Sequence, residues 1–105
     1  MAFTCRLDRD GGTAKITLTG ELDAAAAPEF KQTVEAAASE TVQRLVLLCE
    51  GLEYIASAGL RVLIFARQKM GTGVDIYVIG AQEQVRDTLE KTGFANGVIL
   101  QDSYA

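Results

Sequence analysis

The residue of this chain best suited to chemistry is a serine, Ser57, at the start of an apolar stretch. It follows the apolar run Leu45–Cys49 and a short connecting segment, and the spacing of residues 57–70 predicts a helix. The first turn of a helix has unpaired backbone N–H groups and a partial positive charge, which suit a hydroxyl cap or a phosphate. Ser57 is therefore either an ordinary N-cap or a position where a negative charge can be added.

Nucleophilic catalysis at Ser57 lacks its usual partners in this sequence. The chain has no histidine, which removes the Ser-His-Asp arrangement and the most common general base. Ile55 occupies a position where a G-x-S-x-G elbow has glycine, and no G-x-x-x-x-G-K-[ST] phosphate loop is present. Lys69 would lie about 18 Å along the same helix, too far for a Ser-Lys pair. Lys15 lies in a different predicted strand and stays a candidate partner for Ser57. We therefore expect that the protein is not an enzyme.

Metal and cofactor chemistry has equally few candidate ligands. Cys5 and Cys49 lie in separate apolar segments, and without histidine a zinc site would need both thiolates and additional carboxylates. We expect two buried free thiols, with a disulfide or a reactive pair as the alternative. Glu50 and Glu53 are close enough in sequence to form an acid pair, but such glutamates are more often solvated. We expect no metal and no cofactor.

The composition is that of a globular chain with a core of its own. The 105 residues correspond to one domain, 1–105, with 49% hydrophobic and 23% charged residues. The formal net charge is −4 and basic residues do not cluster, so we expect no binding to nucleic acid. No apolar run approaches the roughly 20 residues of a membrane span, and the first residues lack a secretory signal pattern. We therefore expect a cytoplasmic protein without membrane insertion.

Hydrophobic periodicity predicts five strands and three helices in the order β-β-α-β-α-β-α-β. Alternation of strands and helices indicates an α/β fold with parallel pairing and right-handed crossovers, while the turn Asp10–Gly12 makes the first two strands an antiparallel hairpin. The apolar run 45–49 predicts a strand covered on both faces. The sheet is thus expected to be mixed and mostly parallel, with strands at 3–8, 14–19, 45–49, 74–79 and 98–100 and helices at 24–38, 57–70 and 82–92.

Single residues predict where some elements begin and end. Pro28 fits the first turn of a helix, where its missing N–H costs no hydrogen bond. Gly20 is expected to close the second strand, and Gly93 is expected to follow the last helix as a C′ glycine. Tyr54 and Ile55 are expected to anchor the loop before the serine in the core.

The carboxyl ends of parallel strands meet at one sheet edge, where open α/β sheets bind their ligands. That edge is expected to hold Gly20–Asp23, Glu50–Ser57 and Gly80–Gln82. Asp23 and Ser57, which are distant in sequence, thereby become neighbours. Asp23 is either a turn residue on the approach to a helix or an acid that faces a partner beside Ser57.

The helix that begins at residue 57 offers a candidate surface. Arg61, Phe65 and Gln68 lie on one face by their spacing, and the remainder of the helix is covered by the apolar residues Leu60, Val62, Leu63, Ile64 and Ala66. Phe65 is either a flank residue that lies over the core or part of a partner surface with Arg61. Gly59 costs about 1 kcal/mol of helix stability relative to alanine, which favours a steric requirement for close packing in the first turn.

Three segments make the chain resemble the STAS domains, in particular the single-domain anti-sigma factor antagonists of bacteria. Gly20–Asp23, which reads G-E-L-D before an alanine-rich helix, resembles the G-E-L-D segment of that family. Leu52–Leu60, L-E-Y-I-A-S-A-G-L, resembles its signature of hydrophobic, any, aromatic, aliphatic, Asp, Ser, Ser or Ala, Gly and Leu. Thr92–Phe94 is similar to the family's glycine-aromatic helix end. The similarity covers nearly the whole chain in the same order of elements.

The resemblance implies a regulatory binding module and a STAS-type fold. In that family a kinase-type anti-sigma factor phosphorylates the signature serine, which falls on Ser57 here. The unphosphorylated form captures the kinase and frees its sigma factor, and a serine phosphatase reverses the mark. The residues that the resemblance and the helix spacing assign to the partner surface are Asp23, Ala56, Ser57, Ala58, Gly59, Arg61 and Phe65.

The sequence departs from the family pattern at two positions. The family usually has aspartate immediately before the serine, where this chain has Ala56, and often an acid or amide near the end of the preceding strand, where it has Leu48. Two other classes of function therefore stay open. One is a STAS subunit of a transporter or stress-signalling assembly, which binds a protein without a serine phosphorylation cycle. The other is a small-molecule or nucleotide-binding domain that uses the same sheet edge.

Overall fold

The two N-terminal strands form the hairpin that the turn sequence predicts. In the computed structural model, which describes residues 2–104, β1 (Thr4–Asp10) pairs antiparallel with β2 (Thr13–Leu22). Gly11 turns the chain at a positive φ of 62°, which glycine adopts without steric cost. Met1 and Ala105, which the expected domain includes, lie outside the described residues.

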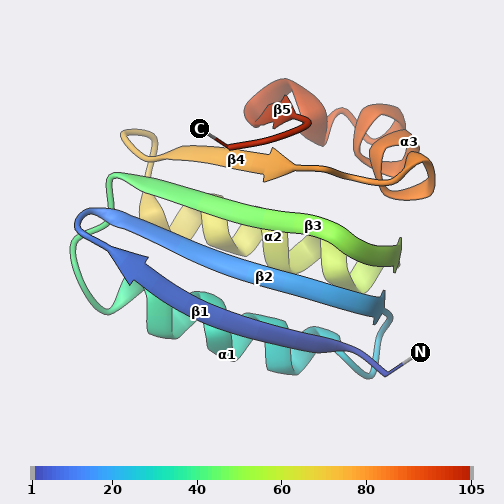
Figure 1. Ribbon diagram of the computed structural model, residues 1–105, viewed down its shortest axis with the longest axis horizontal. Coiled ribbons are helices and arrows are strands. Elements are labelled where there is room, and N and C mark those ends of the chain that lie inside the picture. Colours follow the sequence, from blue (N-terminus) through green and yellow to red (C-terminus); the bar gives the residue numbers. More distant parts are fainter. Residues whose placement is uncertain (1, 105) are drawn as a thin grey trace.

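The later strands lie parallel to β2 and follow it in chain order. β3 (Arg44–Ile55), β4 (Asp75–Ile79) and β5 (Ile99–Gln101) complete a sheet with the order β1-β2-β3-β4-β5 (Figure 1). The predicted α/β class, the mixed and mostly parallel sheet and the order of elements are confirmed.

The helices that connect these strands pack on one face of the sheet. α1 (Ala27–Ala38) joins β2 to β3, α2 (Ser57–Met70) joins β3 to β4, and α3 (Glu83–Lys91) leads through a 3₁₀ turn at Phe94–Gly97 to β5. Right-handed crossovers between strands that are added in one direction place every connecting helix on the same face. Figure 1 shows α1 and α2 side by side beneath β1, β2 and β3. Within residues 2–104, no helix is long and apolar enough to cross a membrane.

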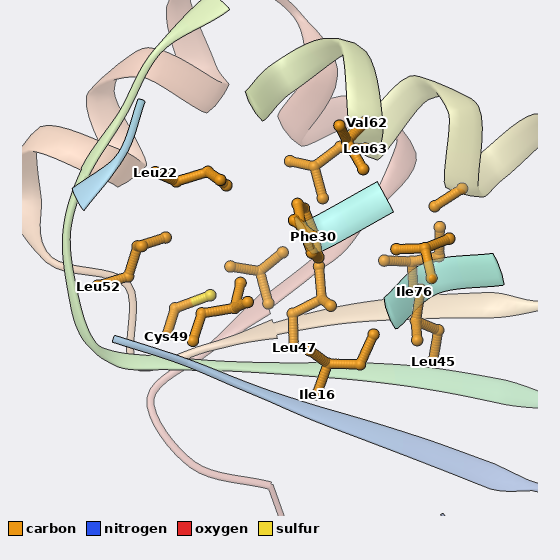
Figure 2. Close-up of a cluster of buried hydrophobic side chains, with 14 of the residues drawn as sticks. Ile16, Leu22, Phe30, Leu45, Leu47, Cys49, Leu52, Val62, Leu63 and Ile76 are labelled. Carbon is orange, nitrogen blue, oxygen red and sulfur yellow. The ribbon is translucent and has the colours of Figure 1, made fainter. Parts of the chain in front are cut away.

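The hydrophobic core fills the space between this helical face and the sheet. Figure 2 shows Phe30 of α1 between Leu63 of α2 and Leu47 of β3, and all three side chains are at most 3% exposed. Burial of side chains of this size stabilises the fold by about 1.5–3 kcal/mol each. The core therefore holds α2, and with it the position of Ser57, firmly against the sheet.

Two predicted helix ends are confirmed, and one helix is shorter than expected. Pro28 lies in the first turn of α1, and Gly93 follows α3 in the left-handed conformation, with φ of 79°. The helix expected from residue 24 begins at Ala27 instead. The preceding residues form a turn, because the carbonyl oxygen of Asp23 accepts hydrogen bonds from the N–H groups of Ala26 and Ala27.

β2 and β3 both extend further than the sequence predicts. Gly20, expected to end the second strand, lies inside β2 at a φ of 85°. A Cβ atom there would lie 2.3 Å from the carbonyl oxygen of Ala2, so glycine lets the two chain segments approach closely. Most of the segment 50–56, expected as a loop, belongs to β3. Ser57 is thus approached by a strand rather than by a free loop.

A bulge in β3 changes which side chains face the core. Gly20 and Glu21 pair with Leu52 and Tyr54, so that Glu53 is an extra residue in β3. Beyond this bulge Ile55 is buried, as predicted, whereas Tyr54 is 41% exposed. The prediction of a core position for Tyr54 is wrong, because the expected loop is a strand, in which the adjacent residues Tyr54 and Ile55 face opposite sides.

Within residues 2–104 the second face of the sheet carries no helix, yet the run 45–49 is buried on both faces as expected, except that Leu48 is half-buried. Val46 points to this face and is nevertheless fully buried. Lys15, Val46 and Tyr77 form one row across β2, β3 and β4. The ring of Tyr104 meets Tyr77 edge to face at a centroid distance of 5.3 Å, and the Lys15 Nζ lies 5.5 Å from its centroid. The Tyr104 side chain, beyond β5, therefore meets both ends of the row that has Val46 at its centre.

Candidate functional site

Ser57 is the first residue of α2, and its side chain is exposed. The N-cap is Ala56, whose backbone is extended at φ −90° and ψ 170°, and no side chain caps this helix. The interpretation of Ser57 as an N-cap is therefore wrong. The reason lies in the sheet, because the N–H of Ala56 donates to the carbonyl of Leu22 at 2.9 Å and keeps Ala56 in the extended chain. The Ser57 hydroxyl thus lies at a positive helix end without serving as its cap.

Asp23 lies next to the segment that carries Ser57, as the sheet-edge argument predicts. It follows Leu22, the residue that pairs with Ile55 and binds the N–H of Ala56. The Asp23 Oδ1 accepts a hydrogen bond from the N–H of Ala26 at 2.9 Å, which is the turn role that its residue type predicts. Its carboxylate also lines a shallow hollow of about 290 Å³ with the exposed Glu21 and the N-terminal turn of α1.

The small residues after Ser57 allow α2 to start close to the sheet. Gly59 is buried, and a Cβ atom there would lie 2.7 Å from the Cγ of Leu22 and 3.0 Å from the Cγ1 of Ile55. The predicted steric requirement at Gly59 is therefore present in the structure. Ala58 is half-buried beside it. Together with Ala56, these residues leave the Ser57 side chain without bulky chain neighbours on either side.

A groove runs from Ser57 along α2 toward the end of α3. Its walls come from successive turns of α2 and from the segment after α3, and its volume is about 340 Å³. This volume lies near the lower end for small-molecule pockets, so size alone fits either a ligand or a partner side chain. Its lining residues are Ser57, Leu60, Arg61, Ile64, Thr92, Gly93 and Phe94.

Ile64 and Phe94 are two groove residues that the sequence did not assign to a partner surface. Ile64, one of the apolar residues on the remainder of the helix, is 48% exposed. Its spacing from Ser57 follows the i, i+3, i+4, i+7 rule, and this signal in the sequence was sufficient to place it on the Ser57 face. Phe94 reaches the groove because Gly93 redirects the chain after α3, which helix periodicity does not reveal.

Arg61 and Phe65 lie one turn apart on α2 and have different surroundings. Arg61 is exposed and lines the groove. Phe65 is half-buried, packs against the core and carries the Lys31 ammonium group of α1 at 4.8 Å from its ring centroid. Of the expected face of Arg61, Phe65 and Gln68, Arg61 therefore lines the groove beside Ser57, whereas Phe65 packs toward α1. The flank interpretation describes the surroundings of Phe65.

The cysteines offer little nucleophilic chemistry. Both thiols are free; Cys49 is buried, whereas Cys5 is only half-buried. Burial raises the pKa of Cys49 to about 12 and also raises the pKa of Cys5, whose Sγ lies 3.1 Å from the Thr33 hydroxyl. Among the described residues, no three histidine, cysteine or carboxylate side chains cluster as metal ligands would.

The comparisons with known proteins agree with this architecture. The STAS domain family matches residues 5–105, so the chain belongs to the STAS domain family. An anti-sigma factor antagonist from Mycobacterium paratuberculosis superposes with a TM-score of 0.88 at 22% identity, over 97% of this chain and 87% of that one. A search of curated proteins gave no match.

Two further similar structures are forms of one protein, SpoIIAA. The anti-sigma factor antagonist SpoIIAA in its unphosphorylated form has a TM-score of 0.78 at 20% identity, covering 94% of this chain and 87% of that chain. The Bacillus cell fate determinant SpoIIAA in the phosphorylated form has a TM-score of 0.70 at 19% identity, covering 94% and 90%. At these identities the likeness shows the fold alone.

Proposed function

We propose that this chain is an anti-sigma factor antagonist that is switched off by phosphorylation of Ser57. The observation that carries the proposal is the exposed Ser57 hydroxyl in the first turn of α2, beside a groove, in a STAS fold. The similar structures named anti-sigma factor antagonists support it, as does the existence of one of them in a phosphorylated form. The partner is then a kinase-type anti-sigma factor, and a serine phosphatase restores the active state. Such a regulator of transcription acts in the bacterial cytoplasm, where sigma factors work.

The groove along α2 gives the partner a place to bind. Leu60, Ile64 and Phe94 supply apolar contact area, and Arg61 adds a cation. Asp23 and the small residues Ala56, Ala58 and Gly59 border the serine and let a partner backbone approach it. Phe65 contributes by holding α2 against α1 rather than by direct contact.

Phosphorylation would act locally rather than by refolding the chain. A phosphate adds about −1.5 to −2 charges at Ser57. The positive end of α2 stabilises an anion, so the protein itself tolerates the change. A partner surface that packs carboxylates or apolar groups against Ser57 loses that contact through repulsion and desolvation. The switch is then a change in affinity with the fold preserved.

One alternative has a specific observation in its favour. Ala56 removes the acid that usually precedes the serine in this family, and Leu48 occupies the strand position where an acid or amide is frequent. A STAS subunit of a transporter or stress-signalling assembly, which binds a protein without a serine cycle, needs neither group. This alternative keeps the groove as the protein-binding surface and removes the role of phosphate.

The deciding experiment is phosphorylation of the purified protein. We expect that a kinase-type anti-sigma factor encoded beside this chain adds one phosphate in the presence of ATP, as measured by intact mass and peptide mapping. Ser57→Ala should abolish the modification, while Ser39→Ala and Ser103→Ala, which change the other two serines, should retain it. Binding of the same kinase without phosphate transfer would refute the Ser57 switch, and the absence of binding would refute the proposed partner. Capture of a transporter or stress-signalling component through the groove would then favour the alternative.

A further inference from the structure

The second half of β3 lacks a neighbouring strand on one side. β2 accompanies β3 to its last residue, where Leu22 pairs with Ile55. β4 accompanies it only to Leu48, because the chain leaves the sheet after Ile79. Backbone groups on the far side of residues 49–55 therefore need other partners. This is the stretch that leads directly into Ser57.

Two glutamines at the start of α3 fill this position. The Gln82 Nε2 donates to the carbonyl of Glu50 at 2.8 Å, and the N–H of Ile55 donates to the Gln84 Oε1 at 3.3 Å. Gly80, at φ 70°, brings the chain close enough, since a Cβ atom there would lie 2.4 Å from the Cγ of Glu50. The two side-chain amides thus take the place of backbone hydrogen bonds that a neighbouring strand would make, one at Glu50 and one at Ile55.

These contacts join the start of α2 to α3. The N–H of Ile55 is held by Gln84, and the N–H of the next residue, Ala56, is held by Leu22. Ser57 follows immediately as the first residue of α2. The segment directly after α3 supplies Thr92 and Phe94 to the groove. One end of α3 therefore holds the backbone before the serine, and the chain that leaves its other end borders the groove.

We infer that Gln84, assisted by Gln82, is a positioning residue that sets the presentation of Ser57 to its partner. The inference rests on the proposed function for the identity of that partner, but the positioning itself is a property of this chain. Loss of the Gln84 acceptor releases the N–H of Ile55, and the backbone at Ser57 becomes less fixed.

The experiment compares Gln84→Met with Gln84→Glu. Methionine keeps the length of the side chain and removes the acceptor, while glutamate keeps an acceptor and suits the first turn of α3. We expect the Gln84→Met protein to exchange its Ile55 amide about fivefold to tenfold faster by NMR, because one net hydrogen bond is lost. The amide signals of residues 57–59 should shift in the same variant, and Gln84→Glu should restore both readouts. Gln32→Met, which changes an exposed glutamine of α1, serves as the matched control.

Function is measured on the same variants with the kinase-type anti-sigma factor. We expect Gln84→Met to lower the affinity or the rate of Ser57 phosphorylation about threefold to tenfold, and Gln84→Glu to restore it. Unchanged exchange at Ile55, changes confined to α3, or changed exchange with unaltered affinity and phosphorylation would each overturn the inference. If the parent protein binds no such kinase, the proposed function fails, while the exchange data still show whether Gln84 positions the backbone before Ser57.

Discussion

The N–H of Ala56 donates to the carbonyl of Leu22 at 2.9 Å, so the last backbone bond of the β2–β3 pair lies one residue before Ser57. This bond makes Ala56 the N-cap and leaves the serine hydroxyl free of a capping role. It also ties the Ser57 segment to the residue before Asp23. The placement of the candidate phosphorylation site therefore depends on sheet pairing rather than on side-chain capping.

Ser57→Ala should have little effect on stability. The loss of a capping serine typically costs about 1 kcal/mol, but Ser57 caps nothing, so we expect a change within about 0.5 kcal/mol. Urea unfolding followed by circular dichroism measures this change. Asp23→Ala is the matched comparison, because it removes the hydrogen bond to Ala26 and should cost about 1 kcal/mol. A loss above 1 kcal/mol for Ser57→Ala would mean that its hydroxyl has a structural partner.

Ser57→Asp should weaken partner binding while the fold is kept. The carboxylate imitates part of the phosphate charge at the positive end of α2, where the protein tolerates it. We expect at least about a tenfold loss of affinity for the anti-sigma factor, measured by calorimetry, with an unchanged circular dichroism spectrum. Ser57→Asn, of similar size and uncharged, should lose much less. Equal affinity of the aspartate variant and the parent would rule out the charge switch.

Gly59→Ala should destabilise the protein. The new methyl group would lie 2.7 Å from the Cγ of Leu22, which is fully buried and cannot move aside. Overpacking of this kind costs about 1–3 kcal/mol, and the better helix propensity of alanine returns up to about 1 kcal/mol. Thermal unfolding should therefore show a lower midpoint. Gly73→Ala is the control, since a Cβ atom there has open space and should leave the midpoint unchanged or slightly raised.

Ile64→Ala and Phe65→Ala should separate partner binding from stability. Ile64 is 48% exposed in the groove, so its truncation should weaken partner binding at least about threefold with little loss of stability. Phe65 packs on the core beside Lys31, so its truncation should cost about 1–2 kcal/mol and change affinity less. Pull-down titration and urea unfolding of both variants test this. The reverse pattern would place the partner surface on the α1 side of α2.

Stability should fall at high pH because of Cys49. Burial raises its pKa from 9.0 to about 12, so the unfolded chain loses the thiol proton first. The contribution of the protonated Cys49 thiol to the free energy of unfolding is complete below about pH 9. It is lost as the pH rises toward 12, at about 1.4 kcal/mol per pH unit. Urea unfolding of the parent and Cys49→Ala between pH 8 and about 10.5 should show a shallower decline for the variant. Parallel declines would indicate that the buried thiol does not cause the loss.

The sequence predicted the architecture well because its signals are local. Alternation in β1, apolar runs in β3 and β4 and the spacing of α2 each reflect burial on one periodic face. The extension of β2 through Gly20 and the bulge at Glu53 were not predictable in this way. Both depend on which residue of a neighbouring strand lies opposite, and that register is decided by the assembled sheet.

For the candidate site, the sequence predicted the helix start at Ser57, the steric role of Gly59 and the proximity of Asp23. It did not predict the cap at Ala56, because the hydrogen bond from Leu22 comes from a distant strand. The helical spacing of Ile64 was sufficient to predict that it lies on the Ser57 face, whereas no local pattern indicated the role of the glutamines of α3. These glutamines bind backbone groups of β3 that have no neighbouring strand. That lack becomes apparent only when the end of β4, opposite Leu48, is compared with the end of β3 at Ile55.

The position of Tyr104 also bears on the synthesis of the protein. Its ring meets Tyr77 of β4 and lies close to the Lys15 ammonium group of β2, at the two ends of a row whose centre is Val46 of β3. Each residue of that row precedes Tyr104 in the chain, so the contacts can form only after residue 104 has been synthesised. The packing of this sheet face is therefore incomplete until the segment beyond β5 has been made.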